Sequence, residues 1–195
     1  MSKLYFRFGA MNCGKSTVLM QVAHNYEERG MHVLLLKPSI DKKAEDRISS
    51  RIGIERKVDY LVTDVKGLRE YLANVSKEVK CILVDEAQFL NREEVDELFI
   101  FSKFTNIPVI CYGLKTDFKA NAFPGSSRLF ELADELEELT TICECGKKAH
   151  FNARLINGEF TNEGEQVAID GIDASYVPLC GECYLSKVLK MERKK

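Results

Sequence analysis

Short apolar runs recur through the first two thirds of the chain, and each has the length and composition of a β-strand. Residues 3–8 alternate between apolar and polar types and include three aromatic residues, which is typical of a strand. Residues 33–36 are apolar throughout, as expected for a strand buried on both faces of a parallel sheet. Further strands are expected at 60–62, 79–84 and 107–112.

Between these strands, apolar residues recur at intervals of three or four positions, which predicts amphipathic helices. The helices are expected at 16–29, 67–77, 92–104 and 128 to about 138, the last of them capped by Ser127. Strands and helices therefore alternate along the chain. Such alternation predicts an α/β fold with a parallel sheet and right-handed crossovers.

Two segments depart from this alternation. Residues 39–57 are rich in charge and lack apolar periodicity, so we expect a long mobile loop that is either a lid over a ligand or a plain surface insertion. Beyond residue 139, two strands are expected at 149–156 and 159–162, joined by a tight turn at 157–158. We therefore expect a nucleotide-binding domain of residues 1–139 and a smaller domain of residues 140–195.

Composition narrows the classes of protein that are possible. The 195-residue chain is 45% hydrophobic and has a net charge of −2, which is ordinary for a globular protein. A charge so near neutrality argues against partners such as nucleic acid or anionic membrane. Lys3 and Arg7 interrupt the first apolar run, so we expect no signal peptide, and no run approaches the length of a membrane span. The expected location is the cytoplasm.

The clearest candidate for chemistry lies between the first strand and the first helix. The segment reads G-x-x-x-x-G-K-S, the pattern of a phosphate-binding P-loop. Backbone N–H groups and the positive end of the helix would bind a polyphosphate, Lys15 would reach its outer phosphates, and the Ser16 hydroxyl would join a Mg²⁺ shell. The predicted nucleotide-binding residues are Gly9, Ala10, Met11, Asn12, Cys13, Gly14, Lys15 and Ser16.

An acidic pair, Asp85 and Glu86, follows the apolar run at 79–84. In a parallel sheet this strand end lies beside the P-loop, where Asp85 can hold the Mg²⁺ shell through the Ser16 hydroxyl or water. Metal binding accounts for one carboxylate only. We interpret Glu86 as a base that accepts a proton from an attacking hydroxyl or water; the alternative is a supporting hydrogen bond or a solvated acidic residue.

Four of the seven cysteines come late and in pairs, Cys143 with Cys145 and Cys180 with Cys183. In a reducing compartment, paired cysteines favour metal over disulfide, and four thiolates suit a tetrahedral Zn²⁺ site. Because sulfur fills all four positions, the zinc would be structural and would hold the loop at 163–176 at both ends. The first pair is C-x-C, whereas such ribbons more often have C-x-x-C. The alternative of a nucleic-acid-binding ribbon has little positive charge to support it.

Together these motifs resemble one family, the cytosolic-type (type II) thymidine kinases. The resemblance rests on Met11 in the P-loop, on the Asp-Glu-Ala-Gln-Phe sequence at 85–89, and on Tyr176 before Cys180, and it covers essentially the whole chain. It implies a P-loop (RecA-like) parallel sheet flanked by helices, with a small zinc-ribbon domain whose loop forms a lasso over the nucleoside.

The resemblance also implies roles for individual residues. Glu86 would be the base, and Gln88 would join Asp85 at the cofactor site. Thymine would be held largely by main-chain groups of the lasso. The implied substrate-binding residues are Met11, Phe89, Leu114, Phe118, Phe123, Ile169, Gly171 and Tyr176. The arginine usual in the lid of this family is replaced here by Lys43, which leaves Lys43, Arg47 or Arg51 as candidates for a phosphate contact.

We therefore predict an enzyme that uses ATP, Mg²⁺ and a structural Zn²⁺ to phosphorylate the 5′-hydroxyl of thymidine, and also of deoxyuridine, in nucleoside salvage. The resemblance further implies feedback by dTTP and a homotetramer. Two other classes share the motifs. A recombinase-type ATPase would use its glutamate to activate water and would release ADP without added nucleoside. A zinc-ribbon binding module with a regulatory nucleotide site would bind nucleic acid in a salt-sensitive way.

Overall fold

The computed structural model describes residues 2–39, 46–49, 53, 55–166 and 174–191. Its centre is a six-stranded sheet in the order β5-β2-β6-β7-β1-β8, parallel at every pairing. The strands are β1 (Leu4–Gly9), β2 (His32–Pro38), β5 (Tyr60–Val62), β6 (Val79–Val84), β7 (Val109–Leu114) and β8 (Glu135–Glu138). The predicted α/β class with a parallel sheet flanked by helices is confirmed.

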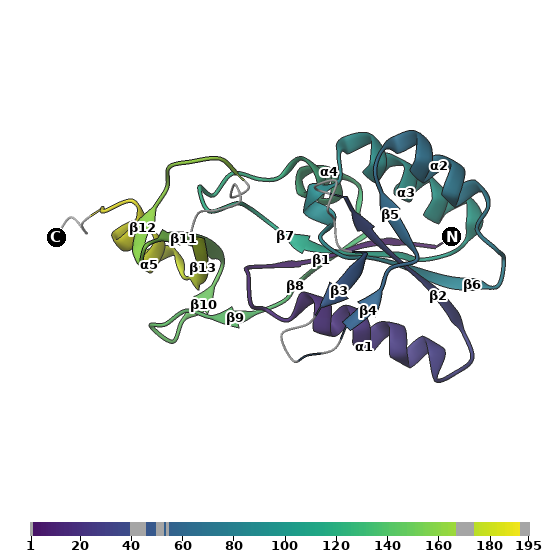
Figure 1. Cartoon of the computed structure of the whole chain (residues 1–195), viewed down its shortest axis with the longest axis horizontal. Helices are drawn as coiled ribbons and strands as arrows, with labels where there is room; N and C mark the ends of the chain where they lie inside the picture. The colour runs from purple at the N-terminus through teal and green to yellow at the C-terminus, as the bar shows by residue number, and fades with distance from the viewer. Residues whose placement is uncertain (1, 40–45, 50–52, 54, 167–173, 192–195) are drawn as a thin grey trace.

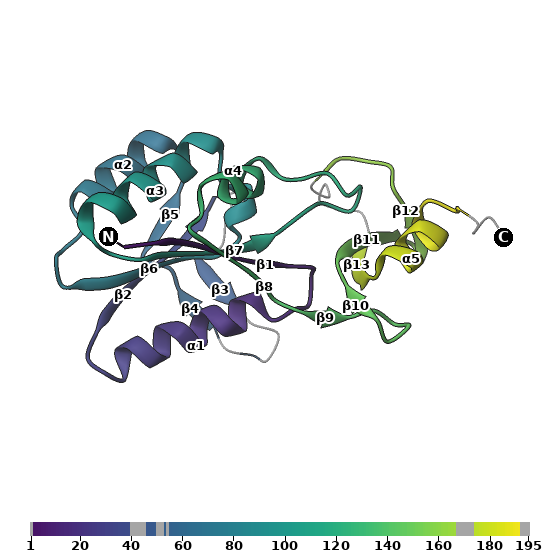
Figure 2. The same cartoon turned by 180° about the vertical axis from the view of Figure 1, so that it is seen from behind.

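Helices cover both faces of this sheet (Figures 1 and 2). Helix α1 (Lys15–Glu27) lies on one face, and α2 (Val65–Ala73), α3 (Arg92–Thr105) and α4 (Pro124–Leu132) lie on the other. The period-two alternation of a strand divides the core accordingly. Leu34 and Leu36 of β2 pack in the cluster under α2 and α3, whereas Val33 and Leu35 pack in the cluster under α1. The continuous apolar run at 33–36 follows from this double burial.

Two helix starts are set by side-chain caps. The Asp64 carboxylate accepts a hydrogen bond from the Gly67 N–H at 2.8 Å, so α2 begins at Val65 rather than at residue 67. At α3, Asn91 and Glu94 form a reciprocal capping box, each side chain accepting from the other residue's backbone N–H at 2.9 Å. The turn at 87–89 (η1, Ala87–Phe89) lies between the end of β6 and the start of α3.

The helix predicted from residue 128 to about 138 is wrong in its second half. Helix α4 runs from Pro124 to Leu132, and the chain then forms strand β8, which pairs in parallel with β1. Strand β8 lies at the edge of the sheet, and its backbone groups form hydrogen bonds with β1 on one side. Arg7 Nε of β1 also forms an ion pair with Glu137 Oε2 of β8 at 2.6 Å. Ser127 lies inside α4, which begins at Pro124 after an extended residue.

The segment predicted as a long loop at 39–57 contains regular structure. Strands β3 (Arg47–Ser49) and β4 (Glu55–Lys57) pair antiparallel, and Ile48 is buried against the cluster under α1. Residues 40–45, 50–52 and 54 lie outside the described residues, and so do the predicted phosphate contacts Lys43 and Arg51. Arg47 forms an ion pair with Glu55 at 3.4 Å.

The remainder of the chain forms a smaller unit, here called the cysteine module (described residues 140–166 and 174–191). Strand β11 (Phe151–Ile156) is central and pairs antiparallel with β12 (Glu159–Thr161) and β13 (Ala174–Leu179). A two-stranded ladder of β9 (Thr141–Ile142) and β10 (Lys148–Ala149) precedes it, and α5 (Gly181–Cys183) and η2 (Tyr184–Val188) follow. The module lies at one end of the molecule (Figures 1 and 2).

The predicted boundary at 139 falls between β8 and β9. The Tyr184 hydroxyl crosses between the two units and donates to the Phe118 carbonyl at 2.7 Å. Among the described residues, no helix has both the length and the apolar character needed to cross a membrane.

Candidate active site

The glycine-containing loop joins the carboxyl end of β1 to α1. Asn12 and Gly14 have positive φ angles of 67° and 79°, so the backbone turns sharply before the helix begins at Lys15. At Gly9 a Cβ atom would lie 2.5 Å from both the Cys13 sulfur and the Leu139 carbonyl. The loop is therefore packed against its own side chains and the end of β8, and only glycine fits at its first position.

Lys15, Ser16 and Asp85 meet at the start of the helix. The Lys15 ammonium donates across the loop to the Ala10 carbonyl at 3.0 Å. The Ser16 hydroxyl donates to Asp85 Oδ2 at 3.1 Å, which links the loop to the end of β6. Sequence positions 69 residues apart thus form one site. Strand β7 lies between β1 and β6, but the carboxyl ends of parallel strands all lie at the same edge of the sheet.

The electrostatics of this site suit a bound cation. Asp85 is 3% exposed. Burial raises the pKa of its carboxyl to about 6, and the neighbouring negative charge of Glu86 adds to the effect. A divalent cation beside Ser16 and Asp85 would offset both influences. A hydroxyl and a carboxylate are oxygen donors of the kind that Mg²⁺ prefers.

Glu86 lies next to Asp85 in sequence but faces a different space. Its φ of 51° is in the left-handed region, which is uncommon for a residue with a side chain. Such strain concentrates at functional sites, where neighbouring contacts maintain it. Here the Gln88 amide donates to the Glu86 carboxylate, and Gln88 Oε1 accepts from the Leu114 N–H at 3.0 Å. The turn therefore separates the two carboxylates, with Asp85 toward the loop and Glu86 toward an adjacent cavity.

That cavity has a volume of about 390 Å³, and aromatic and apolar side chains form most of its wall. The structure brings six of the predicted substrate-binding residues together around it. Ile169 and Gly171 lie outside the described residues. Gln88, predicted for the cofactor site, also lines this cavity. The lining residues are Met11, Lys37, Glu86, Gln88, Phe89, Leu114, Asp117, Phe118, Phe123, Asn152, Gln166 and Tyr176.

Sequence reasoning missed several polar residues of this wall. Asp117 is 5% exposed; its Oδ1 accepts from two backbone N–H groups, and its Oδ2 accepts from the Gln166 side chain at 3.1 Å. Arg154, 3% exposed, lies behind the wall, where its guanidinium is 3.6 Å from the centroid of the Phe118 ring. In the sequence, Asn152 and Arg154 are recognisable only as polar residues at alternating positions of the strand expected at 149–156. The same pattern is typical of a strand face exposed to solvent, so it did not identify them as site residues.

The four late cysteines come together in the cysteine module. All four sulfur atoms lie within 4.8 Å of one another, and the Cys145 and Cys180 sulfurs are 3.5 Å apart. Tetrahedral zinc with Zn–S bonds of about 2.3 Å requires sulfurs roughly 3.8 Å apart. Burial opposes ionisation of Cys143, but hydrogen bonds from the backbone N–H groups of Cys145 and Cys180 and from the thiols of Cys145 and Cys183 together outweigh it and lower the pKa of the Cys143 thiol to about 7. The residues present therefore fit a zinc ion.

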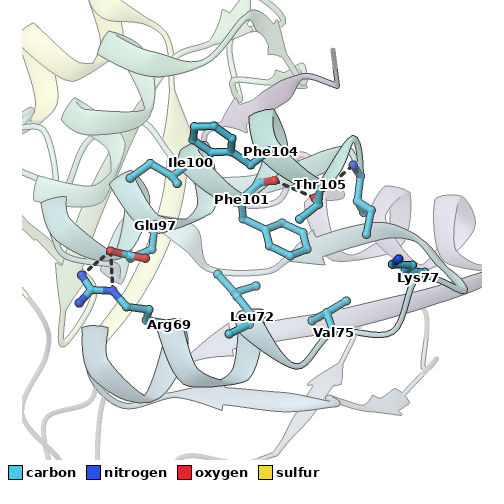
Figure 3. A pocket seen from close by; sticks show the side chains of 11 residues that line it. Arg69, Leu72, Val75, Lys77, Glu97, Ile100, Phe101, Phe104 and Thr105 are labelled. Carbon is cyan, nitrogen blue, oxygen red and sulfur yellow. Dashed lines mark hydrogen bonds and ion pairs between the residues drawn. The ribbon is translucent and has the colours of Figure 1, made fainter.

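A second, larger hollow of about 660 Å³ lies between α2 and α3. Figure 3 shows Leu72 and Val75 facing Phe101 across it, with the ion pair of Arg69 and Glu97 at one end. It adjoins the amino ends of β6 and β7, whereas the loop, Asp85 and Glu86 lie at carboxyl ends. Ligands of open α/β sheets bind outside the carboxyl ends, so this hollow is separate from the candidate site.

The family model and the related sequences agree on one family. The family model described as thymidine kinase matches residues 2–184. The thymidine kinase of Idiomarina loihiensis is 47% identical over 184 residues, covering 92% of this chain and 94% of the relative. The thymidine kinase of Legionella pneumophila (strain Lens) is 49% identical over 184 residues, covering 92% and 88%. That of Mannheimia succiniciproducens is 43% identical over 194 residues, covering 98% and 99%.

Proposed function

The chain belongs to the thymidine kinase family, and on that premise we propose that it transfers the γ-phosphoryl group of ATP to the 5′-hydroxyl of thymidine with Glu86 as the general base. Phosphorylation of thymidine in nucleoside salvage is the reaction of the family. The observation that carries the assignment of residues is the turn after β6. It directs Asp85 to the Ser16 hydroxyl and Glu86 to the aromatic cavity, so that one short segment lies between the two substrate sites.

The loop and its neighbours would hold the triphosphate. Lys15 must exchange its contact with the Ala10 carbonyl for phosphate oxygens, a short movement of a flexible side chain. Ser16 and Asp85 would hold Mg²⁺, which when bound neutralises the charge that develops on the transferring phosphoryl group. The positive end of α1 and the N–H groups of the loop would add to this neutralisation.

Glu86 would accept the proton of the nucleoside hydroxyl. Gln88 donates to its carboxylate and therefore fixes the orientation of the acceptor oxygen. The carboxylate lines the cavity itself, where a hydroxyl of the bound sugar can reach it. A base positioned in this way contributes roughly 10²- to 10⁴-fold to turnover.

The cavity would bind the nucleoside. Phe89 and Phe123 meet edge to face with ring centroids 5.4 Å apart, and Phe118 and Tyr176 complete an apolar wall suited to a flat pyrimidine. Such a wall would also exclude water from the transferring phosphoryl group and limit ATP hydrolysis. Deoxyuridine, which lacks only the methyl group of thymine, would be a second substrate.

The cysteine module would keep the cavity closed on one side. A structural Zn²⁺ held by the four cysteines would fix the ends of β9 and β13. The triphosphate end product, dTTP, would compete with thymidine for the same cavity and so inhibit the enzyme. A homotetramer and a cytoplasmic location, where thiolates persist for zinc binding, complete the proposal.

The test replaces Glu86 by glutamine and measures phosphorylation of thymidine. Turnover should fall roughly 10²- to 10⁴-fold, with a much smaller change in thymidine KM. Glu78→Gln, at an exposed position, is the matched control. Turnover of Glu86→Gln at the wild-type rate would show that Glu86 is not the base. ADP release measured separately with each of the four deoxynucleosides tests the choice of substrate.

A further inference from the structure

One buried amide connects the P-loop to the cysteine module. Asn152 lies on β11 and is 3% exposed. Its Oδ1 accepts from the Met11 N–H at 2.7 Å, and its Nδ2 donates to the Thr116 carbonyl at 2.9 Å. The three residues come from the P-loop, the segment after β7 and the cysteine module, so a single side chain joins all three parts of the candidate site.

The contact with Met11 acts on the phosphate-binding lysine. The Met11 N–H belongs to the same peptide plane as the Ala10 carbonyl, and that carbonyl accepts from the Lys15 ammonium at 3.0 Å. Because a peptide unit is planar, fixing its N–H also fixes the direction of its carbonyl. Asn152 therefore fixes the direction of the Ala10 carbonyl, which is the acceptor of the Lys15 hydrogen bond.

The contact with Thr116 acts on the nucleoside side. Thr116 directly precedes Asp117 and Phe118, both of which line the cavity. Within the described residues, the Thr116 hydroxyl is buried without a hydrogen-bond partner. The backbone here is held by a bridge between Thr116 and Ala122, and the Asn152 amide adds a hydrogen bond to the Thr116 carbonyl. Losing the Asn152 amide would remove one hydrogen bond from the loop and one from the segment that carries Asp117 and Phe118.

We propose that Asn152 is a positioning residue that holds the phosphate-binding loop and the nucleoside wall in register; this inference rests on the proposed function of the cavity. The position requires one acceptor and one donor on adjacent atoms. A neutral amide supplies both, a carboxylate supplies acceptors only, and a protonated carboxyl again supplies both. The chemistry therefore predicts a distinctive behaviour for the aspartate variant.

The experiment measures kcat and KM of Asn152→Asp as a ratio to wild type across pH. Near neutral pH the ionised carboxylate still accepts from the Met11 N–H but has no donor for the Thr116 carbonyl. The loss of that one hydrogen bond, with the repulsion between the two oxygens, corresponds to a fall in kcat of about 10- to 100-fold. Burial raises the pKa of a carboxyl, so the ratio should recover as the pH falls toward about 6. Glu86 and Asp117 line the same cavity and are present in both proteins, so dividing by wild type removes their common titration.

Two further variants complete the design. Asn162→Asp adds the same charge at an exposed position of the same module and should show no pH-dependent recovery. Asn152→Ser removes the amide without adding charge, leaves space for water, and should lose kcat at every pH while the protein stays folded and keeps its zinc. Serine therefore provides the test if the aspartate variant does not fold.

The outcomes separate the inference from the function it rests on. A wild-type enzyme that does not phosphorylate thymidine would refute the proposed function. An active wild type with Asn152→Ser at full activity, or with a folded Asn152→Asp that does not recover on acidification, would refute the positioning role alone. Recovery of Asn152→Asp to within a few-fold of wild type would support it.

Discussion

Arg154 provides the sharpest prediction about the cavity proposed to bind the nucleoside, whose wall near Arg154 (here called the nucleoside wall) consists of Phe118, Gln166 and Tyr176. Its Nε donates to the Tyr176 hydroxyl at 2.9 Å, and its Nη2 donates to the Gln166 carbonyl at 3.3 Å. Its guanidinium also lies 3.6 Å from the centroid of the Phe118 ring. All three partners line the cavity, and Arg154 itself is behind them. Replacing Arg154 by methionine keeps the volume and removes all three interactions.

The magnitude follows from these contacts. A hydrogen bond from a charged donor contributes about 1.5–3 kcal/mol, and we assign that amount to Tyr176 and less to the longer Gln166 contact. A desolvated cation–π contact contributes about 2 kcal/mol. Part of the total of about 4 kcal/mol appears as lost stability of the wall in the free enzyme. If half appears in nucleoside binding, the thymidine KM rises about 30-fold.

The assay varies thymidine at saturating ATP and then ATP at saturating thymidine. For Arg154→Met the thymidine KM should rise and the ATP KM should stay near wild type, because Arg154 contacts the nucleoside wall and not the loop. Arg154→Lys keeps the charge over Phe118 but lacks the fork that reaches two acceptors, so its effect should be intermediate. Arg92→Met, which removes an exposed ion pair with Glu131, is the control for loss of charge.

Two results would refute this reasoning. One is a thymidine KM for Arg154→Met within two-fold of wild type in a folded protein. The other is an equal rise in the KM of both substrates, which would place the effect in the whole fold and not in the wall.

Three other predictions concern stability and zinc. Gly125→Ala should lower the free energy of unfolding by about 1–3 kcal/mol in urea, because its Cβ would lie 2.5 to 2.9 Å from three carbonyl oxygens of residues 87–90. Tyr184→Phe should cost about 1–3 kcal/mol in thermal unfolding, because it leaves the buried Phe118 carbonyl without its donor. Cys143→Ser, or chelation of wild type, should release the zinc, expose the cysteine module to protease and raise the thymidine KM about tenfold or more.

Each of these predictions has a control or an outcome that contradicts it. Gly181→Ala would place its Cβ 3.6 Å from the nearest atom, so it should unfold like wild type. An unchanged unfolding midpoint for Gly125→Ala, or for Tyr184→Phe, would contradict the close contacts described. Cys13→Ser, outside the module, should keep its zinc, and full zinc retention by Cys143→Ser would contradict the four-sulfur site.

The central sheet was predictable because its strands are buried on both faces and therefore read as apolar runs. The P-loop and the acidic pair at 85–86 were predictable because local spacing determines them. Strand β8 was not, since Glu135–Glu138 carries no apolar run and is a strand only because β1 offers it a partner about 130 residues earlier. The contact of Asn152 could not be predicted for the same reason, because its hydrogen-bond partner Met11 is 141 residues away in the sequence.

The cysteine module therefore does more than hold a loop at its ends. Asn152 and Arg154 are two positions apart on β11, so both project from the same face of the strand, one to the P-loop and the other to the nucleoside wall. Their register is set by β13, where Asn152 pairs with Pro178 and Arg154 with Tyr176. Cys180 follows β13 directly, and a zinc ion there would fix that register. A slip of one residue would turn both side chains to the opposite face, so zinc loss should affect both substrate sites together.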